Sequence, residues 1–287
     1  MSAPSCTPVD FRGADALRLH REGEGTVIVL RHGGHVVSWQ DPSGTERLYL
    51  SPISPLDGSA AVRGGVPVIF PQFSTRGPLG RHGFARTMPW QWLDQADRPE
   101  DTASMTLALS SSPATLPLWP EAFHIELRVS LAPWVLSLAL SVRNTGERPW
   151  AFTGALHTYL AAGPLGAVRI DGLQHNPFED ALASGEQRPA SHEPLVLHGP
   201  VDRIYSGVEG PLTLNSPLGQ LGLTQPGWPD TVVWNPGAAG AQALVDLPDD
   251  GHDRFLCVEA ALINRPQVLQ PGEVWTATQR LQGSPLV

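Results

Sequence analysis

Two segments near the middle of the chain alternate strictly between large apolar residues and polar or small ones. Every second position in residues 125–131 is Ile, Leu or Val, and the same holds for residues 136–142. Side chains of a β-strand point alternately to its two faces, so each segment predicts a strand with one buried face. Ala132 and Pro133 between them predict a turn. At least part of the core is therefore expected to consist of half-buried strands.

Glycine and proline punctuate the whole chain of 287 residues, with 29 of each. This spacing favours many short strands over long helices. Gly33 and Gly34 predict a hairpin between residues 26–30 and 35–39. Further strands are expected at residues 105–109, 152–160, 168–171, 212–215, 220–224, 231–234, 256–260 and 273–281. We expect an all-β sandwich or barrel in one domain over residues 1–287, with residues 1–20 peripheral.

Composition excludes several classes of function. The net charge of −9 argues against general nucleic-acid binding, which needs a broad basic surface. All 19 basic residues are arginine, which rules out a Walker P-loop, a pyridoxal Schiff base and a lysine nucleophile. Two cysteines and ten histidines show no zinc spacing, so no metal site is expected.

The sequence also bears on the compartment. Residues 1–10 lack the basic and apolar regions of a signal peptide, and no apolar run approaches the length of a membrane span. We expect a cytoplasmic protein without a membrane partner.

One window is strongly biased in charge. Residues 58–93 contain four arginines and no acidic residue, so this window carries +4 and the remainder of the chain −13. The arginines stand beside glycines and a histidine, in Arg63-Gly64-Gly65 and in the run from Arg81-His82 to Arg86. Arginine recognises phosphate and carboxylate groups, and glycine lets a ligand approach the backbone. The window predicts an anion site; a solvated basic loop is the alternative.

Two titratable residues stand within predicted strands. His157 shares a face with Tyr159 and Thr153, which predicts a polar cleft or, alternatively, a structural histidine. Glu259 interrupts the apolar run 255–262, where an ionised carboxylate is costly unless it is paired. It either faces solvent or acts as an acid–base group. His82, Asp202 and Arg203 are expected in loops.

Seven collinear segments carry a resemblance to a known family. The chain resembles the aldose 1-epimerase (galactose mutarotase-like) superfamily, and most closely its hexose-6-phosphate mutarotase branch. The matching segments are RGGVPVIFPQF (63–73), HGFARTMPW (82–90), ALHTY (155–159), VDRIY (201–205), VWNP (233–236), CVEA (257–260) and LQPGEVW (269–275).

The resemblance implies a large antiparallel β-sandwich, the galactose mutarotase-like supersandwich. It implies an isomerase that interconverts hexose anomers without a metal or organic cofactor, and whose partner is a small-molecule sugar phosphate. The family's catalytic histidine and glutamate map onto His157 and Glu259. Ligand contacts of the phosphosugar branch map onto Arg63, Arg86 and Asp202, with His82 beside them. We expect a monomer.

The reaction explains why these groups are needed. Glu259 as carboxylate would take the proton of the anomeric hydroxyl, while His157 as imidazolium protonates the ring oxygen. The nearby carboxylate predicts a pKa of His157 above about 6.5. Two departures affect the substrate: Arg81 stands where the branch has glutamine, and Gly237 follows Pro236 where an aromatic is common. An enzyme for free aldoses and a non-catalytic carbohydrate-binding protein of the same fold remain alternatives.

Overall fold

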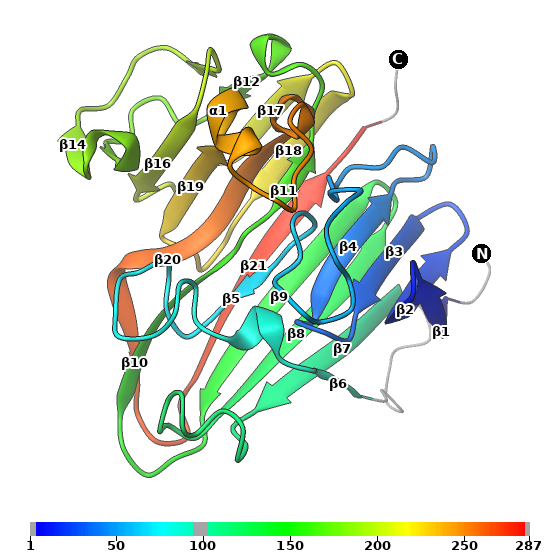
Figure 1. Ribbon diagram of the computed structural model, residues 1–287, viewed down its shortest axis with the longest axis vertical. Coiled ribbons are helices and arrows are strands. Elements are labelled where there is room, and N and C mark those ends of the chain that lie inside the picture. The colour runs from blue at the N-terminus through cyan, green and yellow to red at the C-terminus, as the bar shows by residue number, and fades with distance from the viewer. Residues whose placement is uncertain (1–3, 94–102, 285–287) are drawn as a thin grey trace.

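The computed structural model describes residues 4–93 and 103–284, and its three sheets are antiparallel throughout (Figure 1). The largest sheet has nine strands in the order β15-β12-β17-β18-β21-β9-β8-β7-β6. Its strands are β6 (Gln91–Leu93), β7 (Ala103–Ser110), β8 (Phe123–Ala132), β9 (Val135–Asn144), β12 (Arg169–Asp171), β15 (Leu195–Val196), β17 (Leu212–Ser216), β18 (Gly219–Thr224) and β21 (Val274–Gln282).

The hairpin of β8 and β9 lies within this sheet and confirms the two alternating segments. It pairs Phe123 with Asn144 at one end and Ala132 with Val135 at the other, around the predicted turn. Leu127 and the other large apolar side chains of β8 are almost completely buried, while the residues between them are partly exposed. The burial follows from the period of two.

The second sheet has eight strands and carries most of the residues discussed below. Its path is β14-β13-β16-β19-β20-β10-β5, and β11 also pairs with β20. The strands are β5 (Val68–Ile69), β10 (Trp150–Leu156), β11 (Tyr159–Ala161), β13 (Phe178–Asp180), β14 (Glu186–Arg188), β16 (Val201–Ser206), β19 (Asp230–Asn235) and β20 (Phe255–Leu269). The expected strand at residues 152–160 is thus interrupted between β10 and β11.

The third sheet corrects the expectation for the N-terminal residues. It contains β1 (Ser5–Phe11), β2 (Ala14–Arg21), β3 (Gly25–Leu30) and β4 (His35–Gln40), and its β3–β4 pair confirms the predicted hairpin. Leu17 and Leu19 of β2 are fully buried and belong to the main hydrophobic cluster. Residues 14–20 are therefore part of the core, because β2 lies between two partners and buries one face.

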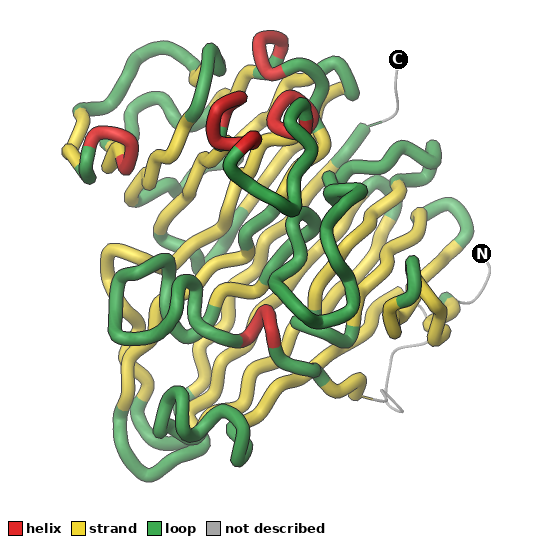
Figure 2. The backbone as a smooth tube through the Cα atoms, in the orientation of Figure 1, coloured by secondary structure: helices red, strands yellow, loops and turns green. Residues whose placement is uncertain are grey.

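Side chains from all three sheets form that main cluster, as in a β-sandwich. Helices are short and lie outside the sheets (Figure 2): η1 (Ala85–Thr87), η2 (Leu165–Ala167), η3 (Ala181–Ala183), α1 (Gly237–Gln242) and η4 (Gly251–Arg254). The all-β sandwich expected from the sequence is confirmed. In the described part of the chain, no helix has the length and apolar character needed to cross a membrane.

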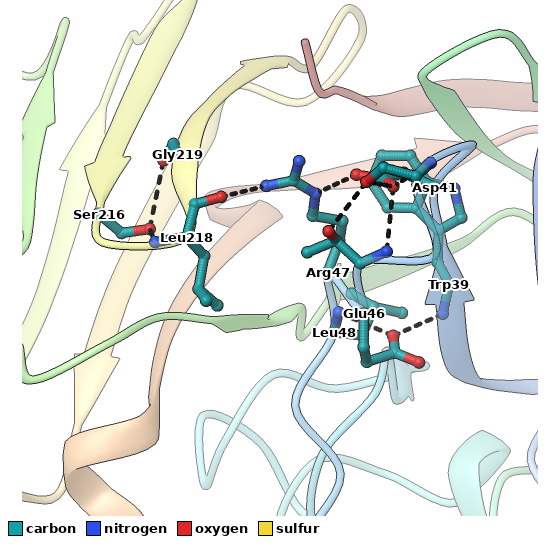
Figure 3. Close-up of polar contacts among 10 residues, drawn as sticks. Trp39, Asp41, Glu46, Arg47, Leu48, Ser216, Leu218 and Gly219 are labelled. Atoms are coloured by element: carbon teal, nitrogen blue, oxygen red, sulfur yellow. Dashed lines mark hydrogen bonds and ion pairs between the residues drawn. The ribbon is translucent and has the colours of Figure 1, made fainter. Parts of the chain in front are cut away.

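A buried ion pair connects the third sheet to the largest one (Figure 3). Arg47 Nε lies 2.6 Å from Asp41 Oδ2, and both side chains are buried. The same guanidinium donates through Nη1 to the carbonyl oxygen of Leu218, at 2.7 Å, in the turn between β17 and β18. Removing one member of such a pair would leave an uncompensated buried charge.

We expect Leu127→Ala to lower the free energy of unfolding by about 2–5 kcal/mol, because the truncation opens a cavity in a closely packed core. Leu118→Ala serves as the control, since Leu118 is 48% exposed, and should stay within about 0.5 kcal/mol of wild type. Urea unfolding measures both. Equal stability of the two variants would contradict the placement of Leu127 in the core.

Candidate active site

One cavity of about 530 Å³ brings together the residues predicted to be catalytic or to contact the substrate. Its lining includes Arg63, Arg81, His82, Arg86, His157, Asp202 and Glu259, together with Arg76, Tyr159, Trp234 and Leu244. Glu259 comes from β20, His157 from the segment between β10 and β11, and Arg86 from η1. Asp202 and its neighbour Arg203 lie in β16, so the expectation that they are loop residues is wrong. His82 lies in a loop, as expected.

Strand register sets His157 against Glu259. Leu156 of β10 pairs with Ala260, and Tyr159 of β11 pairs with Cys257, so the same register carried through the interruption places His157 opposite Glu259. At the interruption the backbone N–H of His157 donates to the carbonyl oxygen of Pro67, at 3.0 Å. At the break the N–H of His157 therefore bonds to Pro67 and not to β20, while the register with β20 is the same on both sides.

The two side chains form a buried pair. His157 Nε2 lies 3.3 Å from Glu259 Oε1, and the residues are 8% and 1% exposed. The alternative that Glu259 is a solvent-facing residue of an apolar strand is therefore wrong. His157 Nδ1 and Glu259 Oε2 are buried and have no hydrogen-bond partner among the described residues. Each group keeps one polar atom available to a ligand.

Burial also decides the protonation of the pair. It raises the pKa of Glu259 well above 4.5, with a further rise from Asp202. It lowers the pKa of His157 well below 6.5, and the nearby His82, Arg86 and Arg63 lower it further. The expectation of a raised histidine pKa is wrong, because it counted the carboxylate and neither the burial nor the cations. Both groups favour their neutral forms.

His82 is a neutral imidazole beside the pair. Its Nδ1 accepts a hydrogen bond from the backbone N–H of Ser74, at 3.2 Å, which leaves Nε2 to carry the proton. Its ring meets the ring of His157 edge to face, with centroids 5.7 Å apart. Burial and the surrounding arginines lower the pKa of His82 to about 3. It can donate a hydrogen bond to a ligand without adding a charge.

Aromatic side chains fix the orientation of His157. Tyr159 stacks on its ring with centroids 4.9 Å apart and planes 12° from parallel, and Trp234 meets it edge-on at 5.8 Å. The Tyr159 hydroxyl accepts a hydrogen bond from Arg63 Nη1, at 3.1 Å. Tyr159 shares the face of His157, as the strand period predicted. Trp234 was missed as a cavity residue, although it belongs to a segment that matches the family.

The four arginines of the acid-free window differ in their partners. Arg63 forms an ion pair with Asp246, with Nη2 and Oδ1 3.2 Å apart, and Arg76 forms one with Glu179. Sequence patterns could not have revealed Asp246, which lies 183 residues from Arg63 in an irregular segment. In the described part of the chain, Arg81 and Arg86 form no ion pair with a carboxylate.

The pKa of Arg86 is lowered, which agrees with its lack of an ion-pair partner among the described residues. Burial, together with Arg63 and Arg81, lowers its pKa, as expected for a cation crowded by other cations. Its Nε is buried without a hydrogen-bond partner among the described residues, while Nη2 donates to the backbone carbonyl of Arg81 at 3.0 Å. The cavity therefore contains two cations that form no ion pair with a carboxylate of the described residues, although Asp246 acts on Arg86 and Asp202 on Arg81 from a longer distance.

Gly64 and Gly65 of this window are needed for close packing of the backbone, and not for the approach of a ligand. At Gly65, whose φ is 61°, a Cβ atom would lie 2.2 Å from the carbonyl oxygen of Val36. At Gly64 it would lie 2.4 Å from the carbonyl oxygen of Tyr49. Both contacts are with neighbouring chain segments, so these glycines let the Arg63 loop pack closely against the sheets.

A short segment after β19 forms another wall of the cavity. Asn235 is 1% exposed and donates through Nδ2 to the carbonyl oxygens of His252 and Phe255, at 2.8 Å each. Its Oδ1 accepts from the backbone N–H of Gly237, whose φ of 63° suits glycine. Asn235 thereby holds both ends of the segment that carries α1, Leu244 and Asp246.

Comparison with known proteins agrees with this architecture. A family model described as aldose 1-epimerase matches residues 15–282. The chain belongs to the aldose 1-epimerase family. A protein of Cenchrus ciliaris is 34% identical over 88% of this chain and 80% of its own length, and one of Salmonella typhimurium is 31% identical over 82% and 79%. Both bear the name "Putative glucose-6-phosphate 1-epimerase".

Solved structures agree with this membership. The crystal structure of a Salmonella typhimurium protein described as a "putative mutarotase" has a TM-score of 0.86 and 26% identity, over 98% of this chain and 93% of that one. A galactose mutarotase-like protein from Clostridium acetobutylicum has a TM-score of 0.76 at 14% identity, over 97% and 98% of the two chains, a likeness of fold alone.

Membership of the aldose 1-epimerase family makes the protein an isomerase. In residues 4–93 and 103–284, no group of three or more His, Cys, Asp or Glu side chains is arranged to hold a metal ion. The groups that line the cavity are suited instead to moving protons between oxygen atoms and to binding an anion.

We expect His157 to be neutral at pH 7 in the ligand-free protein. Its pKa is lowered below 6.5, so its ring should take up a proton only below that pH. Histidine ¹⁵N NMR over a pH series would show this, with His157→Asn identifying the resonance. An imidazolium spectrum for His157 at pH 7 would contradict the effect of burial and of the neighbouring cations.

Proposed function

We propose that the protein interconverts the α and β anomers of a hexose 6-phosphate, the activity of a glucose 6-phosphate 1-epimerase. The observation that carries the proposal is one cavity that contains both a buried His157–Glu259 pair and two arginines without carboxylate partners among the described residues. The pair supplies proton transfer, and Arg81 and Arg86 supply sites for a phosphate. The names of the relatives support the same substrate class.

The mechanism needs two proton transfers and no covalent intermediate. Glu259 as carboxylate takes the proton from the anomeric hydroxyl, while His157 as imidazolium gives one to the ring oxygen, and the ring opens. Rotation about the C1–C2 bond presents the other face of the aldehyde. The protons then return by the reverse transfers, and the ring closes to the other anomer.

The preferred protonation of the pair fits one stage of this cycle. A carboxylic acid beside a neutral imidazole is the state that the pair reaches after ring opening. It holds the same number of protons as the carboxylate–imidazolium state that starts the reaction. Moving one proton between Glu259 and His157 therefore connects the two without exchange with solvent.

The other residues bind and orient the sugar. Asp202 is half-buried in the cavity wall and would accept hydrogen bonds from sugar hydroxyls, and His82 would donate one from Nε2. Arg81 and Arg86 would bind the 6-phosphate. Arg63 is held by Asp246 and Tyr159, so its main role would be to position the Tyr159 ring against His157.

Two rival functions use the same fold. An enzyme for free aldoses would not need Arg81 and Arg86 unpaired, and a non-catalytic sugar-binding protein would not need the buried acid–base pair. Both observations favour the phosphosugar enzyme. A cytoplasmic location, a monomeric state and a single domain over residues 1–287 stay predictions.

We expect Glu259→Gln and His157→Asn each to lower the mutarotation rate by roughly 10²–10⁴, while glucose 6-phosphate still binds. His124 and Glu126 offer a matched control, since their side chains form a similar pair, 2.9 Å apart, on β8 and outside the cavity. His124→Asn and Glu126→Gln should keep the wild-type rate. Polarimetry measures turnover, and a wild-type rate in either cavity variant would remove the mechanism.

We expect kcat/KM to be much higher for glucose 6-phosphate than for glucose. A hydrogen bond to a charged group contributes about 1.5–3 kcal/mol, so Arg86→Ala should lose roughly 10- to 150-fold on the phosphorylated sugar. It should lose little on glucose. Arg188→Ala removes an equal charge from β14, outside the cavity, and should change neither value. Equal values for the two sugars in wild type would favour the free-aldose rival.

A further inference from the structure

His157 is surrounded mainly by positive charge. The Arg63 loop, the His82 loop and η1 present Arg63, His82 and Arg86 toward it, and all three oppose its protonation. On its other sides lie the neutral Tyr159, the buried thiol Cys257 and the carboxyl of Glu259, with Asp202 further along the same cavity. The ring therefore stands in a cationic environment in which Glu259 is the nearest acid.

This environment matches the charge of one ligand group. Arg63 is balanced by Asp246, and His82 is neutral. The excess charge comes from Arg81 and Arg86, for which the described residues provide no carboxylate partner, and a phosphate dianion carries the equal and opposite charge. Such an anion would both bind these arginines and cancel the field that they exert on the buried pair.

We propose that a phosphate dianion bound at Arg81 and Arg86 activates the His157–Glu259 pair, so that the anion site takes part in catalysis as well as in binding. The proposal rests on the function proposed above. It assigns the substrate's own phosphate the task of restoring the carboxylate–imidazolium state that ring opening requires.

Arg86 is the residue through which the anion acts on His157. Arg86 lowers the pKa of His157, whereas Arg81 is the arginine that lowers the pKa of Glu259. An anion that cancels both raises both pKa values. Arg86 is partly buried whereas Arg81 is exposed, so solvent screens the charge of Arg86 less and the release of repulsion is larger at the imidazole. The proton of the pair then shifts from the Glu259 carboxyl toward His157.

The test separates the phosphate from the sugar. Xylose, an aldopentose that lacks C6 and its phosphate, is the substrate, and inorganic phosphite is the free dianion. Polarimetry follows xylose mutarotation, with the enzyme-free rate at each phosphite concentration subtracted. Glucose 6-phosphate turnover with and without phosphite, in the same preparation, reports whether the anion occupies the site and whether the proposed function holds.

We expect saturating phosphite to accelerate the enzymatic xylose reaction by about tenfold or more, equivalent to one unit of pKa, and to inhibit glucose 6-phosphate turnover competitively. The acid limb of the xylose pH profile should move to higher pH. The ¹⁵N resonance of His157 should move toward imidazolium when phosphite is added to the protein alone.

Variants separate the two arginines. Arg86→Gln should abolish the activation, and its pH profile without phosphite should resemble that of wild type with phosphite, because the opposing cation is gone. Arg81→Gln should need more phosphite but reach most of the wild-type activation. Arg188→Gln, outside the cavity, should behave as wild type.

Three results would overturn the inference. Phosphite that inhibits glucose 6-phosphate turnover but leaves xylose unaffected would make the anion site a binding site alone. Activation with an unmoved pH profile and unmoved His157 resonance would indicate a conformational effect instead. If phosphite had no effect on either reaction, the assignment of an anion site to Arg81 and Arg86 would be wrong. Absence of glucose 6-phosphate turnover altogether would instead reject the proposed function, and this inference with it.

Discussion

The antiparallel register of β20 with β10 and β11 is the constraint on which the site depends. It places Glu259 opposite His157 in the interior of a sheet, where both side chains are largely buried and meet solvent only through the cavity. A charged carboxylate is expensive in such a place, so the protein keeps the pair neutral or charges both members together. The proton transfer proposed for this pair thus follows from where the strands place the two side chains.

The arginines around this pair have different roles, although the sequence presents them as one group. Arg63 and Arg76 have carboxylate partners, and Arg63 is part of a connected set of contacts that runs from Asp246 through Tyr159 to the ring of His157. Arg81 and Arg86 form no ion pair within the described residues, which is why the proposed phosphate site is assigned to them. Counting charges in a window predicts an anion site, whereas ion pairing shows which of the cations lack a carboxylate partner among the described residues.

Much of the fold could be predicted from periodicity, since the pairing of β8 with β9 and of β3 with β4 follows from local patterns. The acid-free window indicated the arginines of the cavity, and the predicted strands drew attention to His157 and Glu259, whereas their roles and that of Asp202 came from the resemblance to a family. The break after Leu156, the strand around Asp202 and the Asp246 partner could not be predicted, because each depends on contacts between distant segments. The pKa of His157 was wrongly predicted for the same reason: its burial and cationic neighbours are properties of the folded chain.

The wall after β19 has a different relation to the fold from the rest of the cavity. Asn235 closes the segment at its base and Asp246 attaches it to Arg63. Within the segment, Ala241 and Leu247 are buried in one cluster with Tyr159 of β11 and with Phe255 and Cys257 of β20. A change in the buried residues of this segment would therefore reach Tyr159, whose ring stacks on that of His157. The wall that would shape the space for a substrate and the ring that would transfer the proton are therefore mechanically coupled through Tyr159, and a substitution in one has consequences for the other.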